Sequence, residues 1–440
     1  MTAALKRPHF QIWAIAGPAI IANSSAPIVG LVDTWVIGHL PGAVHLAAVS
    51  VGAMVFSYIF WGFGFLRMST TGLVAQAFGK KDQRQLAGTV VRSIALGLII
   101  ALGLLALQEL IFTAALWALA PPETTLALFE VYFDIRIWSA PAALLLYSIN
   151  GYLIGTAQAK KALWIQLVLN ITNGVLNLVL VLGFDLGVAG IAIGSLIAEW
   201  LAAGLGLLFL AKGLSVAALT EALKHQTTWA RTHMVKLLGT NGFIFVRTLL
   251  LMTALGMVTR KAGSLGEAPL AASHVLSTFL MLISLGLDGF AYAAEALAGA
   301  AFGKGVRRDF RAWVIFGLIW AGAAALLYSA GFYLAGEALI YALTDIEAVR
   351  TAAVDALPVI IALPILAVWC YQFDGVYIGA TAGGAMLGTM AVGFAVFVLS
   401  ADMLTAAMGL KGLWVAVALF MAVRGLGQAI WYPRLERTLS

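Results

Sequence analysis

A carboxylate stands inside an apolar stretch near the start of the chain. Asp33 lies between Leu31-Val32 and Trp35-Val36, and no basic residue occurs within one helical turn of it. A carboxylate placed in lipid is costly and commonly marks a functional site. Because burial without a neighbouring cation favours the protonated form, Asp33 is a candidate for binding and releasing a proton. The alternative is a carboxylate that faces lipid headgroups near the end of its helix.

Amide side chains on one predicted helix are candidate partners of this carboxylate. Asn173 and Asn177 are four residues apart and therefore share a helical face, and Asn170 precedes them on the same stripe. With Asn150 and Ser195 from neighbouring spans, they predict a polar pocket that couples to a proton or a cation. The alternative is hydrogen bonding that only holds helices together, which is common in membranes.

Two prolines precede Asp33 in the same apolar stretch. Pro18 comes early in it, and Pro27 follows Ser25-Ala26. Each proline removes one backbone hydrogen bond and permits a kink. A titrating acid on a helix that can bend is suited to coupling, so Pro18 and Pro27 are predicted hinges.

The composition is that of an integral membrane protein. Of 440 residues, 62% are hydrophobic and 10% are charged, and the mean hydropathy is +0.98. Soluble domains carry roughly a quarter charged residues. The net charge of +6 comes largely from Lys and Arg in short gaps between apolar runs, which indicates cytoplasmic loops rather than a surface for nucleic acid. The single Cys370 and the scattered histidines provide no disulfide and no zinc motif, so we expect no metal and no cofactor.

Apolar runs of roughly 20 residues, the length that crosses a bilayer, divide the chain. We place twelve spans near 10–38, 46–75, 86–115, 126–157, 162–184, 187–211, 232–261, 269–301, 310–336, 349–379, 383–402 and 412–432. Basic loops alternate with loops poor in cations, which predicts that both termini are cytoplasmic. Lys6 and Arg7 precede a run from Ile12 to Leu40 that is too long for a cleavable signal peptide. A multi-pass protein of the cell inner membrane is expected.

An internal duplication relates the two halves of the chain. Three segments recur 224 residues later: Leu46–Ala48 as Leu270–Ala272, Ala77–Lys80 as Ala301–Lys304, and Asn150-Gly151 with Ile154-Gly155 as Asp374-Gly375 with Ile378-Gly379. Each half holds six spans, so the halves have the same orientation. The sequence thus predicts an all-α fold of two six-helix lobes related by a pseudo-twofold axis along the membrane normal.

The predicted domains follow from this duplication. An N-lobe is expected over 1–211 and a C-lobe over 232–440. Between them, 212–231 carries apolar residues at helical spacing among charged ones, which predicts an amphipathic helix on the cytoplasmic surface. A plain flexible linker is the alternative.

The second half does not copy the pocket around Asp33, because Met257 occupies the equivalent position. Its embedded ionisable residues are Arg247, Asp288, Glu295 and Asp374, for which a structural role is favoured over coupling. Asp288 is a candidate partner of Arg247. Side chains that suit a soft cavity for varied apolar ligands are Met54, Tyr58, Met68, Met252, Met257 and Met281. For any one of them, a lipid-facing or core position is the alternative.

These motifs together resemble the multidrug and toxic compound extrusion (MATE) transporters, and in particular their DinF-like branch. The resemblance covers the whole chain and rests on Pro18, Val32–Thr34, Gly64–Met68, Thr70–Ala77, Asn150-Gly151, Asn173, Asn177, Leu287–Ala291, Glu295, Asp374–Gly379 and Gly412–Trp414. It implies a V-shaped pair of six-helix lobes that export drugs against inward proton or sodium flow. It also implies that Asp33 is the coupling carboxylate, with Asn173, Asn177 and Ser195 beside it, and that Pro18 is linked to bending of its helix.

The sequence departs from some members of this family. Those members carry a carboxylate at the position of Asn177, so Asp33 is expected to be the only acid of its pocket. One carboxylate with amides favours a proton over sodium, because a hard cation usually needs more oxygen charge. Other branches place an acid in the seventh span, where this chain has Arg247.

We therefore expect a monomeric secondary antiporter that exports amphipathic or cationic small molecules in exchange for protons. One alternative is sodium-coupled export. Another is a flippase for lipids or lipid-linked oligosaccharides, which needs a cationic cavity that only Arg67 and Arg247 would supply. An enzyme is not expected, because no set of catalytic residues occurs at a useful spacing.

Overall fold

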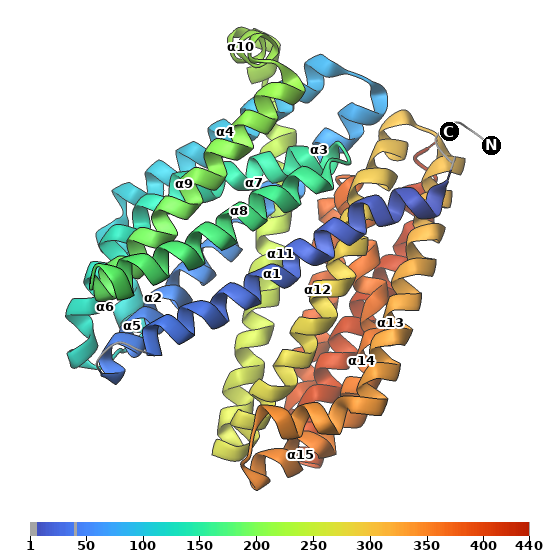
Figure 1. Ribbon diagram of the computed structural model, residues 1–440. Coiled ribbons are helices and arrows are strands. Elements are labelled where there is room, and N and C mark those ends of the chain that lie inside the picture. Colours follow the sequence, from blue (N-terminus) through green and yellow to red (C-terminus); the bar gives the residue numbers. More distant parts are fainter. Residues whose placement is uncertain (1–6, 39–41, 440) are drawn as a thin grey trace. The chain divides into compact units, whose positions relative to one another are not determined.

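The computed structural model describes residues 7–38 and 42–439, and within these ranges every regular element is a helix (Figure 1). Lys6 and Leu40, which bear on the signal-peptide prediction, lie outside the described residues. The first helices are α1 Pro8–Gly38, α2 Ala43–Gly62, α3 Phe65–Lys80, α4 Gln83–Ala106, α5 Gln108–Leu119, α6 Glu123–Arg136, α7 Ala140–Gly155, α8 Ala159–Leu178, α9 Gly187–Leu214 and α10 Val216–Lys224. The remaining ones are α11 Arg231–Ser264, α12 Glu267–Lys304, α13 Arg307–Leu343, α14 Glu347–Gly379 and α15 Gly383–Glu436.

Eleven segments of the described chain are long and apolar enough to cross a membrane. The last one, α15, consists of two helices that meet at a kink, where Gly409 adopts a φ of 59°. Only glycine adopts this backbone conformation without strain. The described part of the chain therefore provides the twelve predicted spans, and the prediction of an all-helical fold is confirmed.

The helices group into two compact units. Among the described residues, one unit comprises those up to Ile20 and those from Gly239 onward, and the other comprises Ile21–Leu238. This division differs from the predicted boundaries at 211 and 232. Helix α1 contributes its first part to one unit and its second part to the other, and α11 is likewise divided near its start.

Aromatic packing explains why the start of α1 belongs with the second half of the sequence. The ring of Trp13 lies edge-on to Phe290 of α12 and to Trp320 of α13, with centroids 5.4 and 5.3 Å apart. Trp320 also donates a 3.0 Å hydrogen bond from Nε1 to Nδ1 of His9. Gly289 of α12 permits this approach, since a Cβ there would lie 2.5 Å from Cγ1 of Ile20.

The sequence duplication has a structural counterpart inside each unit. The repeated Gly-Lys pairs end α3 at Lys80 and α12 at Lys304, and the next residues, Lys81 and Gly305, both adopt a left-handed conformation that closes the helix. The repeated glycines allow helices to touch. A Cβ on Gly155 of α7 would lie 2.7 Å from a carbonyl oxygen of α3, and a Cβ on Gly379 of α14 would lie 2.7 Å from one of α12.

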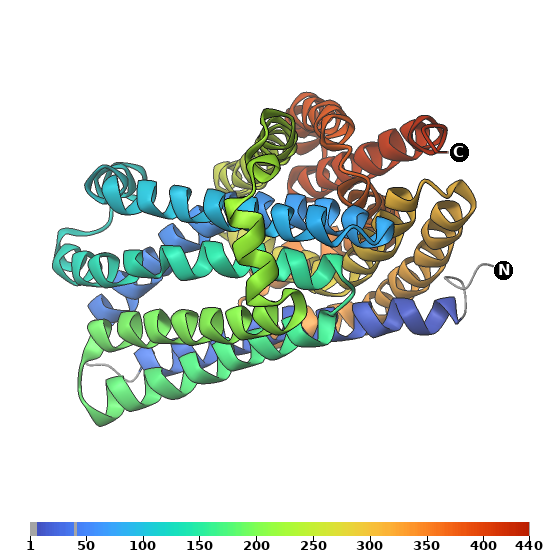
Figure 2. The ribbon, with the colours of Figure 1, turned by 90° about the horizontal axis from the view of Figure 1, so that it is seen from above.

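The segment between the repeats contains a short helix. Ser215 caps α10 by accepting a 3.2 Å hydrogen bond from the backbone N–H of Ala218. A 3-10 turn, Gln226–Trp229, follows α10 and precedes α11. Figures 1 and 2 show α10 crossing the neighbouring long helices of its unit rather than running along them, and it packs against α4.

Candidate functional site

Three helices of the Ile21–Leu238 unit bring the predicted coupling residues together. Asn177 of α8 donates a 2.6 Å hydrogen bond from Nδ2 to Oδ1 of Asp33 on α1. One turn earlier on α8, Asn173 donates a 2.8 Å hydrogen bond to the hydroxyl of Ser195 on α9. The two amides are linked at 3.4 Å. Asp33, Asn177, Asn173 and Ser195 thus form one hydrogen-bonded chain, as the spacing on α8 predicted.

The end of α8 is locally irregular at this point. A π-helical turn, Val179–Gly183, begins two residues after Asn177. Such turns insert an extra residue into the helical repeat and occur frequently at functional sites. Here the turn follows almost directly after the amide that contacts Asp33.

A cavity of about 210 Å³ lies beside this chain of hydrogen bonds. Its polar lining consists of Asp33, Ser57, Tyr132, Arg136, Asn173, Ser195 and Glu199, and its apolar lining of Ala53, Phe56, Phe60, Leu169 and Ala198. Asp33 therefore faces a partly open cavity with a mixed polar and apolar lining.

Two charged residues of this cavity, Arg136 of α6 and Glu199 of α9, were not predicted from the sequence to belong to the site. They form an ion pair whose side chains are each only 12% exposed, and the guanidinium also lies over the rings of Phe56 and Phe60. The expectation that Asp33 is the only acid of the pocket is therefore wrong. The missed signal was an Arg and a Glu inside predicted spans, with Glu199 one turn after Ser195.

Asp33 remains outside this ion pair. Among the residues that the structure describes, no cation lies within ion-pair distance of its carboxylate, and Asn177 is its hydrogen-bond partner. Arg136 lines the same cavity but is held by Glu199. The site therefore combines a neutralised charge pair with one carboxylate whose charge has no counterion in contact. Such a carboxylate can exchange a proton without breaking an ion pair.

Two buried amide oxygens of the Ile21–Leu238 unit have no hydrogen-bond donor within the described chain, namely Oδ1 of Asn177 and Oδ1 of Asn150. The oxygen of Asn177 lies against Gly194, where any Cβ would collide with it. Asn150 does not line the cavity, so the structure does not bring this predicted residue to Asp33. An unpaired acceptor beside Asp33 is suited to receive a hydrogen bond from a protonated carboxyl group.

Other sequence candidates of this unit lie near the site without entering it. Asn170 donates a 2.7 Å hydrogen bond to the hydroxyl of Ser25 and accepts one of 3.0 Å from Gln166. Pro18 and Pro27 lie within a continuous α1, on either side of the boundary between the two compact units at Ile20.

The charged residues of the second half form a separate cluster centred on Asp374 of α14. Its carboxylate forms ion pairs with Arg247 of α11 and, at 2.9 Å, with Arg424 of α15. Gln428 donates a further 2.6 Å hydrogen bond to it. Arg247 thus pairs with Asp374, whereas Asp288, the partner expected from the sequence, acts electrostatically on Tyr371.

The remaining candidates, which come from both halves of the chain, do not line the cavity at Asp33. Glu295 is buried within α12. Met54, Tyr58 and Met281 are exposed, Met68, Met252 and Met257 are partly buried, and none of the six lines the cavity at Asp33. Their role in a substrate cavity stays a prediction.

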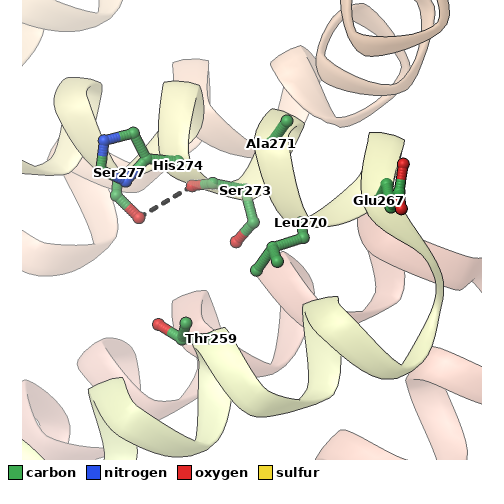
Figure 3. Close-up of a pocket in the computed structure, with 7 residues that line it drawn as sticks. All are labelled: Thr259, Glu267, Leu270, Ala271, Ser273, His274 and Ser277. Atoms are coloured by element: carbon green, nitrogen blue, oxygen red, sulfur yellow. Dashed lines mark hydrogen bonds between the residues drawn. The ribbon is translucent and has the colours of Figure 1, made fainter. Parts of the chain in front are cut away.

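The second half has a pocket of its own, which was not predicted from the sequence. Figure 3 shows this pocket of about 430 Å³ between α11 and α12, lined by Thr259, Glu267, Leu270, Ala271, Ser273, His274 and Ser277. Within it, Ser277 donates a 2.8 Å hydrogen bond to the carbonyl of Ser273. The described residues contain no group of three His, Cys, Asp or Glu side chains that would hold a metal ion.

Comparisons with known proteins give consistent matches over most of the chain. The MatE family model matches residues 18–179 and 244–411. DNA damage-inducible protein F of Escherichia coli (strain K12) is 39% identical over 431 residues, covering 96% of this chain and 91% of that protein. A protein of Rhizobium meliloti named probable multidrug resistance protein NorM is 27% identical over 74% of this chain and 72% of its own length. A crystal structure of a MATE transporter of Vibrio cholerae matches with a TM-score of 0.87 at 20% identity, covering 99% of both chains.

Proposed function

The chain belongs to the multidrug and toxic compound extrusion family, in its DinF-like branch, and is a multi-pass membrane protein; from this premise we propose that it exports amphipathic or cationic small molecules in exchange for protons. The name of the Rhizobium relative supports the multidrug part of this proposal. The proposed location is the cell inner membrane, with both termini in the cytoplasm. The proposed working unit is a monomer that needs no cofactor besides the coupling proton.

The observation that carries the proposal is the environment of Asp33. Its carboxylate faces a cavity, contacts the amide of Asn177, and lies outside the ion pair between Arg136 and Glu199. A coupling group has to gain and lose a proton during each cycle. An acid held by an amide can do so at a lower energetic cost than one held by a buried guanidinium, because no buried charge is left unpaired.

The amide of Asn177 can serve both protonation states of Asp33. In the deprotonated state its N–H group donates to the carboxylate, as observed. In the protonated state the carboxyl O–H becomes a donor, and the amide oxygen, which has no donor among the described residues, is the acceptor beside it. Protonation therefore exchanges one hydrogen-bond arrangement for another through a rotation of the Asn177 side chain.

Helix α1 is the element through which this exchange would reach the rest of the molecule. It carries Asp33 in one compact unit and Trp13 in the other, and Pro18 and Pro27 flank the boundary between them. Because each proline lacks a backbone donor, the helix can bend there at reduced cost. Proton and exported molecule must each favour a different conformation, since equal affinity for both conformations would shift nothing.

The test is transport by the purified protein in proteoliposomes. Uptake of a fluorescent organic cation is measured under an imposed pH gradient or an imposed sodium gradient, for wild type and Asp33→Asn. Asp185→Asn is the matched control, because it makes the same chemical change at an exposed loop of the same unit. We expect transport driven by the pH gradient in wild type and in Asp185→Asn, and transport at background in Asp33→Asn.

The other outcomes revise the proposal in defined ways. Transport driven by sodium alone would retain export and replace the coupling ion. Undiminished proton-driven transport in Asp33→Asn would remove Asp33 from the mechanism. A wild type that responds to neither gradient would contradict the proposed antiport.

A further inference from the structure

A second polar pocket of the Ile21–Leu238 unit shares no lining residue with the Asp33 site and takes no part in the proposed transport chemistry. It has a volume of about 200 Å³ and lies where the start of α4, the 3-10 turn Gln226–Trp229 and the first turn of α11 meet. The residues of its lining that carry the argument are Asp82, Arg84, Arg92, Thr228 and His233.

Arg92 is the unusual member of this pocket. Its side chain is only 5% exposed, yet within the described chain no carboxylate pairs with it. One guanidinium nitrogen donates 2.9 Å to the carbonyl of Thr228, and another donates 3.0 Å to the hydroxyl of Thr89. Its buried Nε has no acceptor among residues 7–38 and 42–439. A buried guanidinium is costly unless an anion or further acceptors offset its charge.

The surroundings of Arg92 add positive charge. Arg84 and His233 line the same pocket, and Arg92 and Lys236 both act electrostatically on His233. Asp82 is the one carboxylate in the described lining, and it caps α4 by accepting a 2.8 Å hydrogen bond from the N–H of Gln85. The pocket therefore also faces the amino end of a 24-residue helix, where the peptide dipoles favour an anion.

We propose that this pocket binds a phosphate group, held by Arg92 and Arg84 and supplied by the headgroup of a membrane phospholipid or by a soluble phosphate. Phosphate offers several acceptor oxygens, which suits a site with two guanidinium groups, an imidazole and helix N–H groups. Basic pockets among membrane helices are known to take phosphorylated headgroups. The pocket lies beside the short connection between α3 and α4, where Lys80, Lys81 and Arg84 are close in sequence. The positive-inside rule predicts that a connection so rich in cations is cytoplasmic.

A bound phosphate would connect three elements that are distant in sequence. Arg92 already links α4 to the 3-10 turn across 136 residues through the carbonyl of Thr228. A ligand bound to Arg92 and Arg84 would hold the segment between the repeats against α4.

The experiment compares wild type with Arg92→Gln and Arg84→Gln in two arms. Arg84 is exposed, so its variant keeps the test informative if Arg92→Gln fails to fold. Arg308→Gln is the matched control, because it removes the same charge from an exposed position in the first turn of α13, in the other unit. The lipid arm uses native mass spectrometry of the purified protein with added phosphatidylglycerol or with a phosphate-free galactolipid. The soluble arm measures thermal unfolding in sodium phosphate against sodium chloride of equal ionic strength.

We expect wild type and Arg308→Gln to retain one phosphatidylglycerol that the galactolipid does not replace, with about tenfold or greater weakening in Arg84→Gln and in Arg92→Gln. The site would be assigned to a soluble phosphate if sodium phosphate stabilises wild type although no phosphatidylglycerol is retained. That stabilisation should then be lost in Arg84→Gln and in Arg92→Gln. Equal retention of both lipids combined with equal stability in both salts would overturn the proposal. Equal binding by wild type and the two pocket variants would overturn it as well.

Discussion

Asp33 and Asp374 are the two carboxylates placed beside amides in the two halves of the chain, and the fold surrounds them very differently. Asp33 accepts one hydrogen bond from Asn177 and faces a cavity. Asp374 is enclosed by Arg247, Arg424 and Gln428, which together contact both of its oxygens. The first carboxylate has room for a proton, whereas the second has its acceptor capacity used by the protein itself.

This contrast shows that the two halves share the close packing of their repeated helices but not the surroundings of their carboxylates. The repeated glycines bring α7 against α3 and α14 against α12 in the same way. Asp374, however, occupies the position equivalent to Asn150, whose amide oxygen has no partner among the described residues. A buried acid with two buried arginines forms a structural cluster, and a buried acid without a counterion is suited to switching.

The largest expected effect is on stability at the Asp374 cluster. In Asp374→Asn, the side chains of Arg247 and Arg424, which are 8% and 4% exposed, lose their anionic partner. Breaking such a buried pair costs about 3–5 kcal/mol. We expect a large fall in the apparent melting temperature in detergent. Asp33→Asn should change stability by about 1 kcal/mol or less, because an amide replaces a carboxylate that pairs with no cation. Equal destabilisation by the two variants would remove the distinction between the two sites.

An intermediate effect is expected at the ion pair beside Asp33. Glu199→Gln releases the guanidinium of Arg136, which lines the same cavity as Asp33 and would become its counterion. We expect proton-driven transport to fall about tenfold or more, which corresponds to about 1.4 kcal/mol. The double variant Glu199→Gln with Arg136→Gln should recover most of the lost transport.

Glu337→Gln, an exposed acid of the other unit, is the control for Glu199→Gln. If the double variant is as inactive as Glu199→Gln alone, the ion pair itself is required, and the idea that it only keeps Arg136 away from Asp33 is wrong.

Local spacing made part of this arrangement predictable from the sequence. Asn173 and Asn177 share a helical face because they are four residues apart. The repeated glycines and the Gly-Lys pairs that end helices recur in the sequence at one fixed offset of 224 residues. The pairing of Arg136 with Glu199 joins residues 63 positions apart, and that of Arg247 with Asp374 joins residues 127 positions apart. Which embedded charges meet depends on how the helices rotate and pack, and a single sequence does not contain that information.

The same limit explains the division of α1. Its apolar run is evident in the sequence, but the packing of Trp13 against Phe290 and Trp320 depends on helices that begin more than 250 residues later. Sequence order alone therefore assigned the whole of α1 to the N-lobe, whereas packing assigns its first part to the other unit.

The smallest effect is expected at Asn170, the first of the three asparagines that share a face of α8 with Asn177. Asn170→Ala removes the hydrogen bonds to Ser25 and from Gln166, and a hydrogen bond between membrane helices contributes about 0.6 kcal/mol on average. We expect stability within about 1 kcal/mol of wild type and proton-driven transport within about twofold. Ser284→Ala, which removes the hydrogen bond between Ser284 and Tyr371 in the other unit, is the control for loss of a contact between helices. If Asn170→Ala abolishes transport while Ser284→Ala does not, the coupling network extends along α8 as far as Ser25, and Asp33 with Asn177 would be only one end of it.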